Sequence, residues 1–176
     1  GGFNLTFDGA GNITVADVIA TGSGTLSKSG SGTLTLSGAN TYTGATTISS
    51  GAVAVSTSAG LGTSAGGTTV ASGAALKLSG GISIADALSV SGSGISSGGA
   101  LVNVSGANTL TGLVTLTGDT ELQSDGGTLT LDVSSGDAIS GAFNLTFDGA
   151  GNIAVADAIA TGSGTLSKSG SGTLTL

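Results

Sequence analysis

Few residues of this 176-residue sequence have the types and spacing that catalysis requires. Residues 62–66, Gly-Thr-Ser-Ala-Gly, match the Gly-x-Ser-x-Gly turn that presents a nucleophilic serine in many hydrolases. That serine needs a histidine base, and the sequence contains no His and no Cys. Glycine pairs at 9–11, 22–24 and 30–32 lack the third Gly and the helix of a nucleotide-binding loop. We therefore expect no enzyme, with no catalytic residue and no cofactor.

A second candidate chemistry is calcium binding by residues 8–12, Asp-Gly-Ala-Gly-Asn, which recur at 148–152. Extracellular β-rolls bind calcium through turns rich in Gly and Asp. The order of residues differs from the β-roll nonapeptide, so we interpret these residues as turn formers whose side chains hydrogen-bond to the backbone. We expect no metal site. Four Asn-x-Ser/Thr glycosylation patterns, at Asn4, Asn12, Asn103 and Asn144, are interpreted as chance matches in a chain rich in Ser and Thr.

The composition narrows the class of protein. Ten acidic residues against three lysines give a net charge of −7, the opposite of what nucleic-acid binding requires. Apolar runs reach only four or five residues, so we expect no membrane insertion by this segment. The 35 glycines would suit a flexible linker, but 38% apolar and 7% charged residues provide enough apolar surface to bury. No export signal opens the sequence, and we expect any such signal to lie outside it.

An internal repeat dominates the sequence. Residues 1–36 return as residues 141–176 with 33 of 36 positions identical, and the three differences are Gly2/Ala142, Thr14/Ala154 and Val18/Ala158. A fainter similarity relates residues 37–44 to residues 105–112. We interpret residues 1–176 as one continuous segment of a longer array. Residues 1–140 form one repeat made of two diverged halves of about 70 residues, and residues 141–176 begin the next repeat.

Apolar and polar residues alternate with period two in many short segments, which predicts β-strands. Examples are residues 3–7, 33–36, 52–55, 76–78, 101–104, 113–117 and 128–133. Gly, Ser, Asn and Asp clusters separate these segments about every ten residues and predict tight turns. Because the chain has only four Phe and one Tyr, a sandwich core is less suitable than a narrow solenoid interior of Val, Ile, Leu, Thr and Ala. At about 20 residues per turn, the repeat is expected to make about seven turns and to rise roughly 34 Å.

Residues 22–55 resemble the autotransporter-associated β-strand repeat, also called the passenger-associated transport repeat. The resemblance is carried by Lys-Ser-Gly-Ser-Gly-Thr-Leu-Thr-Leu at 28–36, Gly-Ala-Asn-Thr-Tyr-Thr-Gly at 38–44, Thr-Thr-Ile at 46–48 and Gly51. In the second half Leu110 stands at the place of Tyr42, so that half looks like a diverged copy. The resemblance implies an all-β fold, a right-handed parallel β-helix, in the passenger of a type V secreted bacterial protein or adhesin, with no active-site residues to carry over.

The function expected from these observations is a non-catalytic structural repeat of an extracellular rod or filament at a bacterial cell surface. Its partners would be neighbouring repeats or identical subunits stacked end to end. One alternative is an adhesin surface that recognises a host glycan or protein, for which the only exposed aromatic residue we expect is Tyr42. Another is a functional amyloid, with identical chains stacked in register. An enzyme built on two carboxylates in one groove is a weaker alternative.

Overall fold

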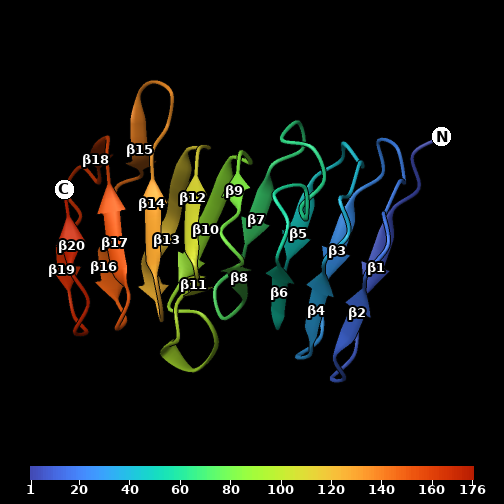
Figure 1. Cartoon of the computed structure of the whole chain (residues 1–176), viewed down its shortest axis with the longest axis horizontal. Helices are drawn as coiled ribbons and strands as arrows, with labels where there is room; N and C mark the ends of the chain where they lie inside the picture. Colours follow the sequence, from blue (N-terminus) through green and yellow to red (C-terminus); the bar gives the residue numbers. More distant parts are fainter.

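The computed structural model describes residues 1–176 and consists of twenty short β-strands and one turn of 3-10 helix, Ile95–Ser97. The strands stack along a single axis, with the N-terminus at one end and the C-terminus at the other (Figure 1). Every strand pair is parallel, and paired strands lie a full turn apart in the sequence. The chain therefore winds as a β-solenoid of about eight turns, which confirms the predicted fold class.

The strands form three stacks, which we call columns I, II and III, and each turn passes through them in that order. Column I contains β1 (Leu5–Phe7), β3 (Leu26–Lys28), β5 (Thr46–Ile48), β7 (Thr68–Val70), β10 (Leu88–Gly92), the first part of β13 (Val114–Ser124), β15 (Asp137–Ser140) and β18 (Ala158–Ala160). Column II contains β2 (Ile13–Val15), β4 (Thr33–Leu36), β6 (Ala52–Val55), β8 (Ala75–Ser79), β11 (Leu101–Ser105), the second part of β13, β16 (Leu145–Asp148) and β19 (Leu166–Lys168). Column III contains β9 (Ser83–Ile84), β12 (Ala107–Leu110), β14 (Thr128–Leu131), β17 (Asn152–Val155) and β20 (Leu174–Thr175).

The third face of the first turns is irregular but still hydrogen-bonded from turn to turn. The backbone N–H of Thr41 donates to the carbonyl of Ile19, and the N–H of Thr63 donates to the carbonyl of Tyr42. Regular column III strands begin at β9 and continue to the C-terminus. The backbone of these irregular segments is thus satisfied by neighbouring turns, as buried backbone groups require.

The turns differ in length, which corrects the expected uniform spacing. The column I pairings of Leu5 with Leu26, Thr46 and Thr68 in succession divide the early chain into turns 5–25, 26–45 and 46–67. The pairings of Leu88, Val114 and Ile139 divide the later chain into the longer turns 88–113 and 114–138. Loops such as residues 93–100, which contain the 3-10 turn, lengthen the later turns without adding a rung. Residues 1–140 therefore make fewer turns than the seven expected.

The two copies of the repeat lie in different columns. Six successive pairings lead from Leu5 through column I to Ile139, and Leu145, the copy of Leu5, lies in the next column of the same turn. Strands β1 to β4 occupy columns I and II, whereas their copies β16, β17, β19 and β20 occupy columns II and III. The unit formed by residues 1–140 therefore makes six turns plus one third of a turn.

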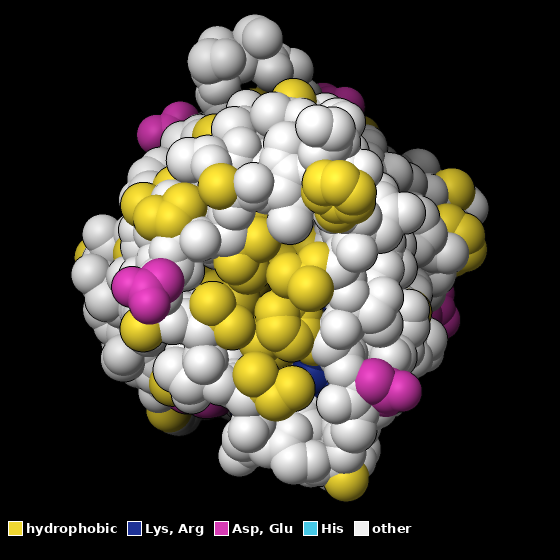
Figure 2. Space-filling model, turned by 90° about the vertical axis from the view of Figure 1, so that its right-hand side faces the viewer, with side chains coloured by type: hydrophobic (Ala, Val, Ile, Leu, Met, Phe, Trp, Pro, Cys, Tyr) yellow, Lys and Arg dark blue, Asp and Glu magenta, His cyan; other side chains and the backbone are white.

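The core is a ladder of inward-facing apolar side chains. In column II the consecutive partners Leu34, Val53, Leu76, Leu101 and Leu122 are each 0% exposed. Burying one such side chain is worth about 2 kcal/mol, and the ladder runs through successive turns. Seen from the N-terminal end, apolar side chains gather at the centre of the face and polar atoms surround them (Figure 2). This alternation follows from the period-two sequence pattern.

Each layer of the solenoid comes from one stretch of a single chain. An in-register amyloid would instead place one whole chain in each layer. The pairing of strands one turn of about 21 residues apart within this chain is the arrangement expected for a solenoid. None of its helical structure has the length and apolar character of a membrane span.

Candidate functional site

Lys28 is buried, which is unusual for a lysine: its side chain points into the solenoid and is 2% exposed. Its Nζ donates hydrogen bonds to the carbonyl oxygens of Ser29 (2.6 Å) and Gly30 (2.8 Å) and, at 3.4 Å, to that of Ser50 in the next turn. Burial lowers the pKa of the Lys28 ammonium, and Asp8 opposes that shift. Lys28 thus satisfies the carbonyls of a corner that the narrow interior would otherwise leave unpaired.

Glycine is required at the corner that Lys28 binds. Gly30 has φ of 71° and Gly51, one turn later, has φ of 67°, a backbone region that favours glycine. A Cβ atom at Gly30 would also collide with the backbone of Gly9 in the preceding turn. The Lys-Ser-Gly sequence therefore forms a stacked corner, with glycine for the close approach and lysine for the free carbonyls.

Asn40 connects three successive turns of the solenoid. Its Oδ1 accepts a hydrogen bond from the N–H of Ile19 (2.8 Å), and its Nδ2 donates to the carbonyl of Gly60 (2.7 Å). Asn108 is placed in the same way, because its Oδ1 accepts a hydrogen bond from the N–H of Ile82 (2.8 Å). Both Asn side chains are buried. They replace strand-to-strand backbone bonds where the chain turns.

A cluster of buried polar side chains lies under columns I and III. Within it Tyr42 is 0% and Asp86 is 4% exposed. The hydroxyl groups of Tyr42 and Thr46 are hydrogen-bonded at 2.8 Å, and the Thr68 hydroxyl donates to Asp86 Oδ2 at 2.9 Å. Burial raises the pKa of Asp86 from 3.8 to about 6, and the Thr68 hydrogen bond partly opposes the shift. Burial likewise raises the pKa of Tyr42 to about 12. Both side chains face the interior, where Tyr42 stays protonated at neutral pH and Asp86 loses its proton as the pH rises through about 6.

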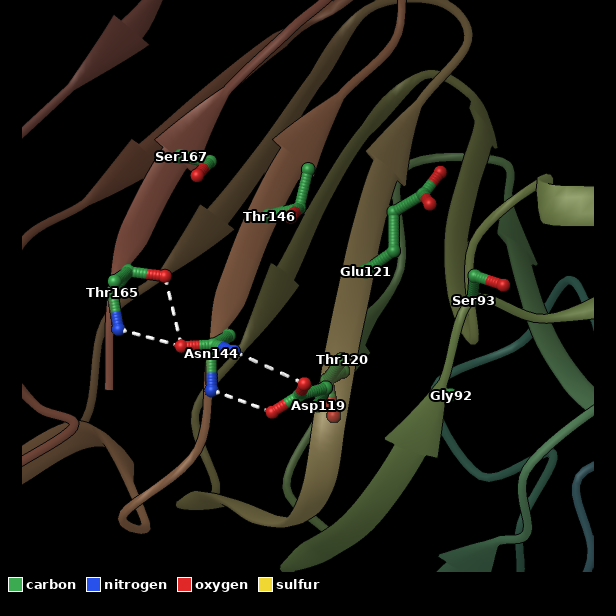
Figure 3. A pocket seen from close by; sticks show the side chains of 9 residues that line it. All are labelled: Gly92, Ser93, Asp119, Thr120, Glu121, Asn144, Thr146, Thr165 and Ser167. Atoms are coloured by element: carbon green, nitrogen blue, oxygen red, sulfur yellow. Dashed lines mark hydrogen bonds between the residues drawn. The ribbon is translucent and has the colours of Figure 1, made fainter. Parts of the chain in front are cut away.

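A polar groove of about 450 Å³ lies over column II, where the two repeat copies meet. No hydrophobic side chain lines it (Figure 3). Its lining residues are Gly92, Ser93, Asp119, Thr120, Glu121, Asn144, Thr146, Thr165 and Ser167. Thr120, Glu121 and Thr146 come from the adjacent strands β13 and β16, and Ser167 from β19. The parallel stacking of three strands therefore builds the wall of the groove.

Asp119 and Glu121, the two carboxylates of the groove, have different environments. Both oxygens of Asp119 accept hydrogen bonds from Asn144, at 2.9 Å from its backbone N–H and 3.0 Å from its Nδ2. Glu121 has one buried oxygen, Oε1, with no hydrogen-bond partner. Burial and the neighbouring Asp148 raise the pKa of Glu121. Asp119 therefore fixes the joint between two turns, whereas Glu121 keeps one buried oxygen unpaired beside the groove.

Comparison with known proteins gives one family match, over the segment that contains Lys28, Asn40 and Tyr42. The model of the Passenger-associated-transport-repeat family matches residues 26–55. Those residues comprise strands β3 to β6. Residues 26–55 thus match a passenger-associated transport repeat. No curated protein and no solved structure matches the chain. The resemblance read from the sequence is confirmed over this segment.

In residues 26–55 of this chain, residues that carry the resemblance have packing roles. Lys28 and Gly30 form one corner, Asn40 bridges three turns, and Tyr42 fills the interior. The expectation that Tyr42 is an exposed aromatic residue is wrong, because the narrow core covers it completely and Thr46 pairs its hydroxyl. The exposed aromatic residues are Phe3 (74%) and its copy Phe143 (38%).

Of the other residues singled out in the sequence, Asp8, Asn12 and Ser64 lie between strands, whereas Asn103 and Asp148 lie within β11 and β16. Ser64 is exposed in the turn before β7. Asp8 Oδ1 accepts a hydrogen bond from the Gly9 N–H at 2.7 Å, and Asp148 binds the Gly149 N–H in the same way at 2.6 Å. These two carboxylates thus make the local backbone bonds predicted for turn formers. No three His, Cys, Asp or Glu side chains come together as metal ligands would. Glu121 and Asp119 were not singled out in the sequence, because their contacts join different turns.

Proposed function

We propose that this chain is a non-catalytic structural segment of an extracellular rod or filament, carried by the passenger of a bacterial autotransporter or adhesin. The family and the fold fit a structural autotransporter passenger repeat, and the family implies a secreted or cell-surface protein. The main support is that the copied residues make the same contacts twice. Asn4 and Asn144 accept from Thr25 and Thr165, and Lys28 and Lys168 bind the same corner carbonyls.

Contacts of this kind extend a rod because they join only neighbouring turns. Leu5 pairs with Leu26, and its copy Leu145 pairs with Leu166. A further unit can therefore stack with the same residue pairs. Two observations support a role without catalysis: the sequence contains no His or Cys, and Asp119 is hydrogen-bonded to Asn144. The partners of the segment would then be neighbouring repeats or identical subunits along the rod.

Electron microscopy of the source bacterium with an antibody raised against residues 1–176 tests this function. We expect label along thin filaments that leave the cell surface, and loss of both label and filaments when the gene is deleted. A cell lacking only the gene is the matched control for antibody specificity. Label confined to the cytoplasm, or to a compact globular head on a short stalk, would contradict the proposal.

A second candidate function is binding of a glycan along the side of the rod. The observation that favours it is the groove of Asp119 and Glu121, whose lining offers only hydroxyl, amide, carboxylate and backbone groups. Such groups bind sugar hydroxyls by hydrogen bonds, although an aromatic platform is lacking. A glycan array with the intact chain and Glu121→Gln tests it. Signals that Glu121→Gln abolishes support binding in the groove, and signals that survive unchanged exclude it.

A further inference from the structure

Residues 1–20 and their copy, residues 141–160, fold alike but differ in how far their apolar surface is covered. Leu145 is 0% and Phe147 is 1% exposed, whereas Leu5 and Phe7 are only partly buried. Ile153 and Val155 are buried in the same manner, and their counterparts in β2 are not. The difference arises because residues 141–160 lie on the turn formed by residues 114–140.

That internal joint uses all three columns. In column II Leu122 pairs with Phe147, and in column III Leu129 pairs with Ile153. Column I adds the pairing of Ile139 with Ile159. Side chains complete the joint: Asp119 accepts two hydrogen bonds from Asn144, and Asp157 Oδ2 accepts one from the Val133 N–H at 2.8 Å. The joint is thus both apolar and hydrogen-bonded.

Residues 1–20 keep every side chain that this joint requires. Asn4 and Asp17 correspond to Asn144 and Asp157, and the apolar residues of β1 and β2 are identical to those of β16 and β17. The three substitutions between the copies fall on Gly2, Thr14 and Val18, which are exposed. The first turn therefore carries the same surface as the copy that is covered in the interior, except at Thr14 and Val18, whose counterparts Ala154 and Ala158 pair with Thr130 and Asp137.

We propose that residues 1–20 seat on a turn with the sequence of residues 114–140 that belongs to a preceding copy of the unit in the same polypeptide. The proposal rests on the proposed rod and specifies how one unit joins the next. β1 would lie on the preceding copy's β13 and β2 on its β14, so each unit is displaced by one column. Each joint would also complete a groove from Asp119 and Glu121 of one unit and Asn4 and Thr6 of the next, as Asn144 and Thr146 complete it here.

A twist between successive turns would compensate for the displacement by one column. A third of a circle spread over a little more than six turns is about 20° per turn, which is the usual twist between neighbouring strands. In Figure 1, β2 and β4 near the N-terminus run in the same direction as their copies β17 and β20 near the C-terminus. Equivalent grooves would therefore recur along one side of the rod, about 30 Å apart at about 4.8 Å per turn.

The joint can be tested by placing residues 105–140 directly before Gly1 of the intact chain. In the interior, the N–H groups of Gly151, Asn152 and Ala156 donate to the preceding turn. We expect their counterparts Gly11, Asn12 and Ala16 to exchange more than about tenfold slower with deuterium in the extended chain. The matched control carries residues 37–72, an extension of equal length from the other half, and should leave these amides unprotected. Protection by both extensions or by neither overturns the proposal, as does protection in the unextended chain at high concentration.

The displacement by one column has its own test, by engineered cysteines in the extended chain, which otherwise contains none. Glu121 pairs with Thr146, so Glu121→Cys in the extension should form a disulfide with Thr6→Cys. Without the displacement, Leu122 would meet Ile13, and Gln123→Cys would cross-link to Thr14→Cys instead. Glu121→Cys with Thr146→Cys in the intact chain is the positive control. Cross-linking of the second pair overturns the displacement, and because purified protein is used, the outcome is independent of where the rod functions.

Discussion

Asp86 is a carboxyl group buried where the solenoid offers it one hydrogen bond, from Thr68. Its pKa in the folded chain is about 6 instead of 3.8, so the folded state binds a proton more tightly than the unfolded state. The contribution of Asp86 to stability is therefore most favourable below pH 3.8 and is lost as the pH rises through about 6. Replacing it with Asn, which stays neutral and can still accept from Thr68, should remove this dependence.

The magnitude follows from the change in pKa. A difference of about two pH units between the folded and unfolded states corresponds to about 3 kcal/mol at neutral pH. We expect Asp86→Asn to raise the free energy of unfolding by about 1 to 3 kcal/mol at pH 7.5 and to change it little at pH 3.5. The lower bound allows for amide hydrogens that find no partner in the interior.

Urea unfolding followed by far-UV circular dichroism at pH 3.5, 5, 6 and 7.5 measures this difference. Asp17→Asn is the matched control, because residues 13–17, Ile-Thr-Val-Ala-Asp, are similar to residues 82–86, Ile-Ser-Ile-Ala-Asp, and Asp17 is exposed. A gain that is the same at every pH, or that Asp17→Asn reproduces, would refute the reasoning from burial.

Three further substitutions test the contacts of residues 26–55 by the same unfolding measurement. Lys28→Met should lower the free energy of unfolding by about 1.5–3 kcal/mol, because the Ser29 and Gly30 carbonyls lose a charged donor. Lys168→Met is the control, since it removes the same bonds at an exposed corner and should leave the urea midpoint of unfolding unchanged. Asn40→Ala should cost about 2–3 kcal/mol, since it leaves the Ile19 N–H and Gly60 carbonyl without partners; a loss below about 0.5 kcal/mol would show that water replaces the amide. Tyr42→Phe should cost about 1 kcal/mol by unpairing the Thr46 hydroxyl, and no change would mean that this hydroxyl finds another acceptor.

Strand positions could be predicted closely because side-chain alternation is a local property. Residues 33–36 and 52–55 were predicted as strands and are β4 and β6. The length of a turn is different, since it depends on how much chain a corner or loop can accommodate. Residues 93–100 add such a loop, and the expected uniform spacing failed there. The sequence pattern contains no signal that separates a loop within a turn from the start of a new one.

The candidate site was harder to predict than the fold. Asp119 and Glu121 are ordinary polar residues in the sequence, and their roles come from Asn144 and Asp148, which lie one turn later. Asp86 likewise gives no sign of burial, because an acid next to alternating apolar residues normally faces water. Stacking of turns decides which polar side chains become neighbours. Such neighbours are a full turn apart in the sequence, which exceeds the range of any local pattern.

The sequence by itself determined that this protein is built from repeated short strands, since period-two alternation and the near-identity of residues 1–36 and 141–176 need no tertiary information. Only the tertiary structure decided that the unit of residues 1–140 makes six turns plus one third of a turn, which is a displacement by one column. Unequal turn lengths add up to a fraction of a turn, and that fraction places identical strands, such as β1 and β16, in different columns. The physical reason is that strand formation depends on neighbouring residues, whereas stacking depends on the total length of chain between them.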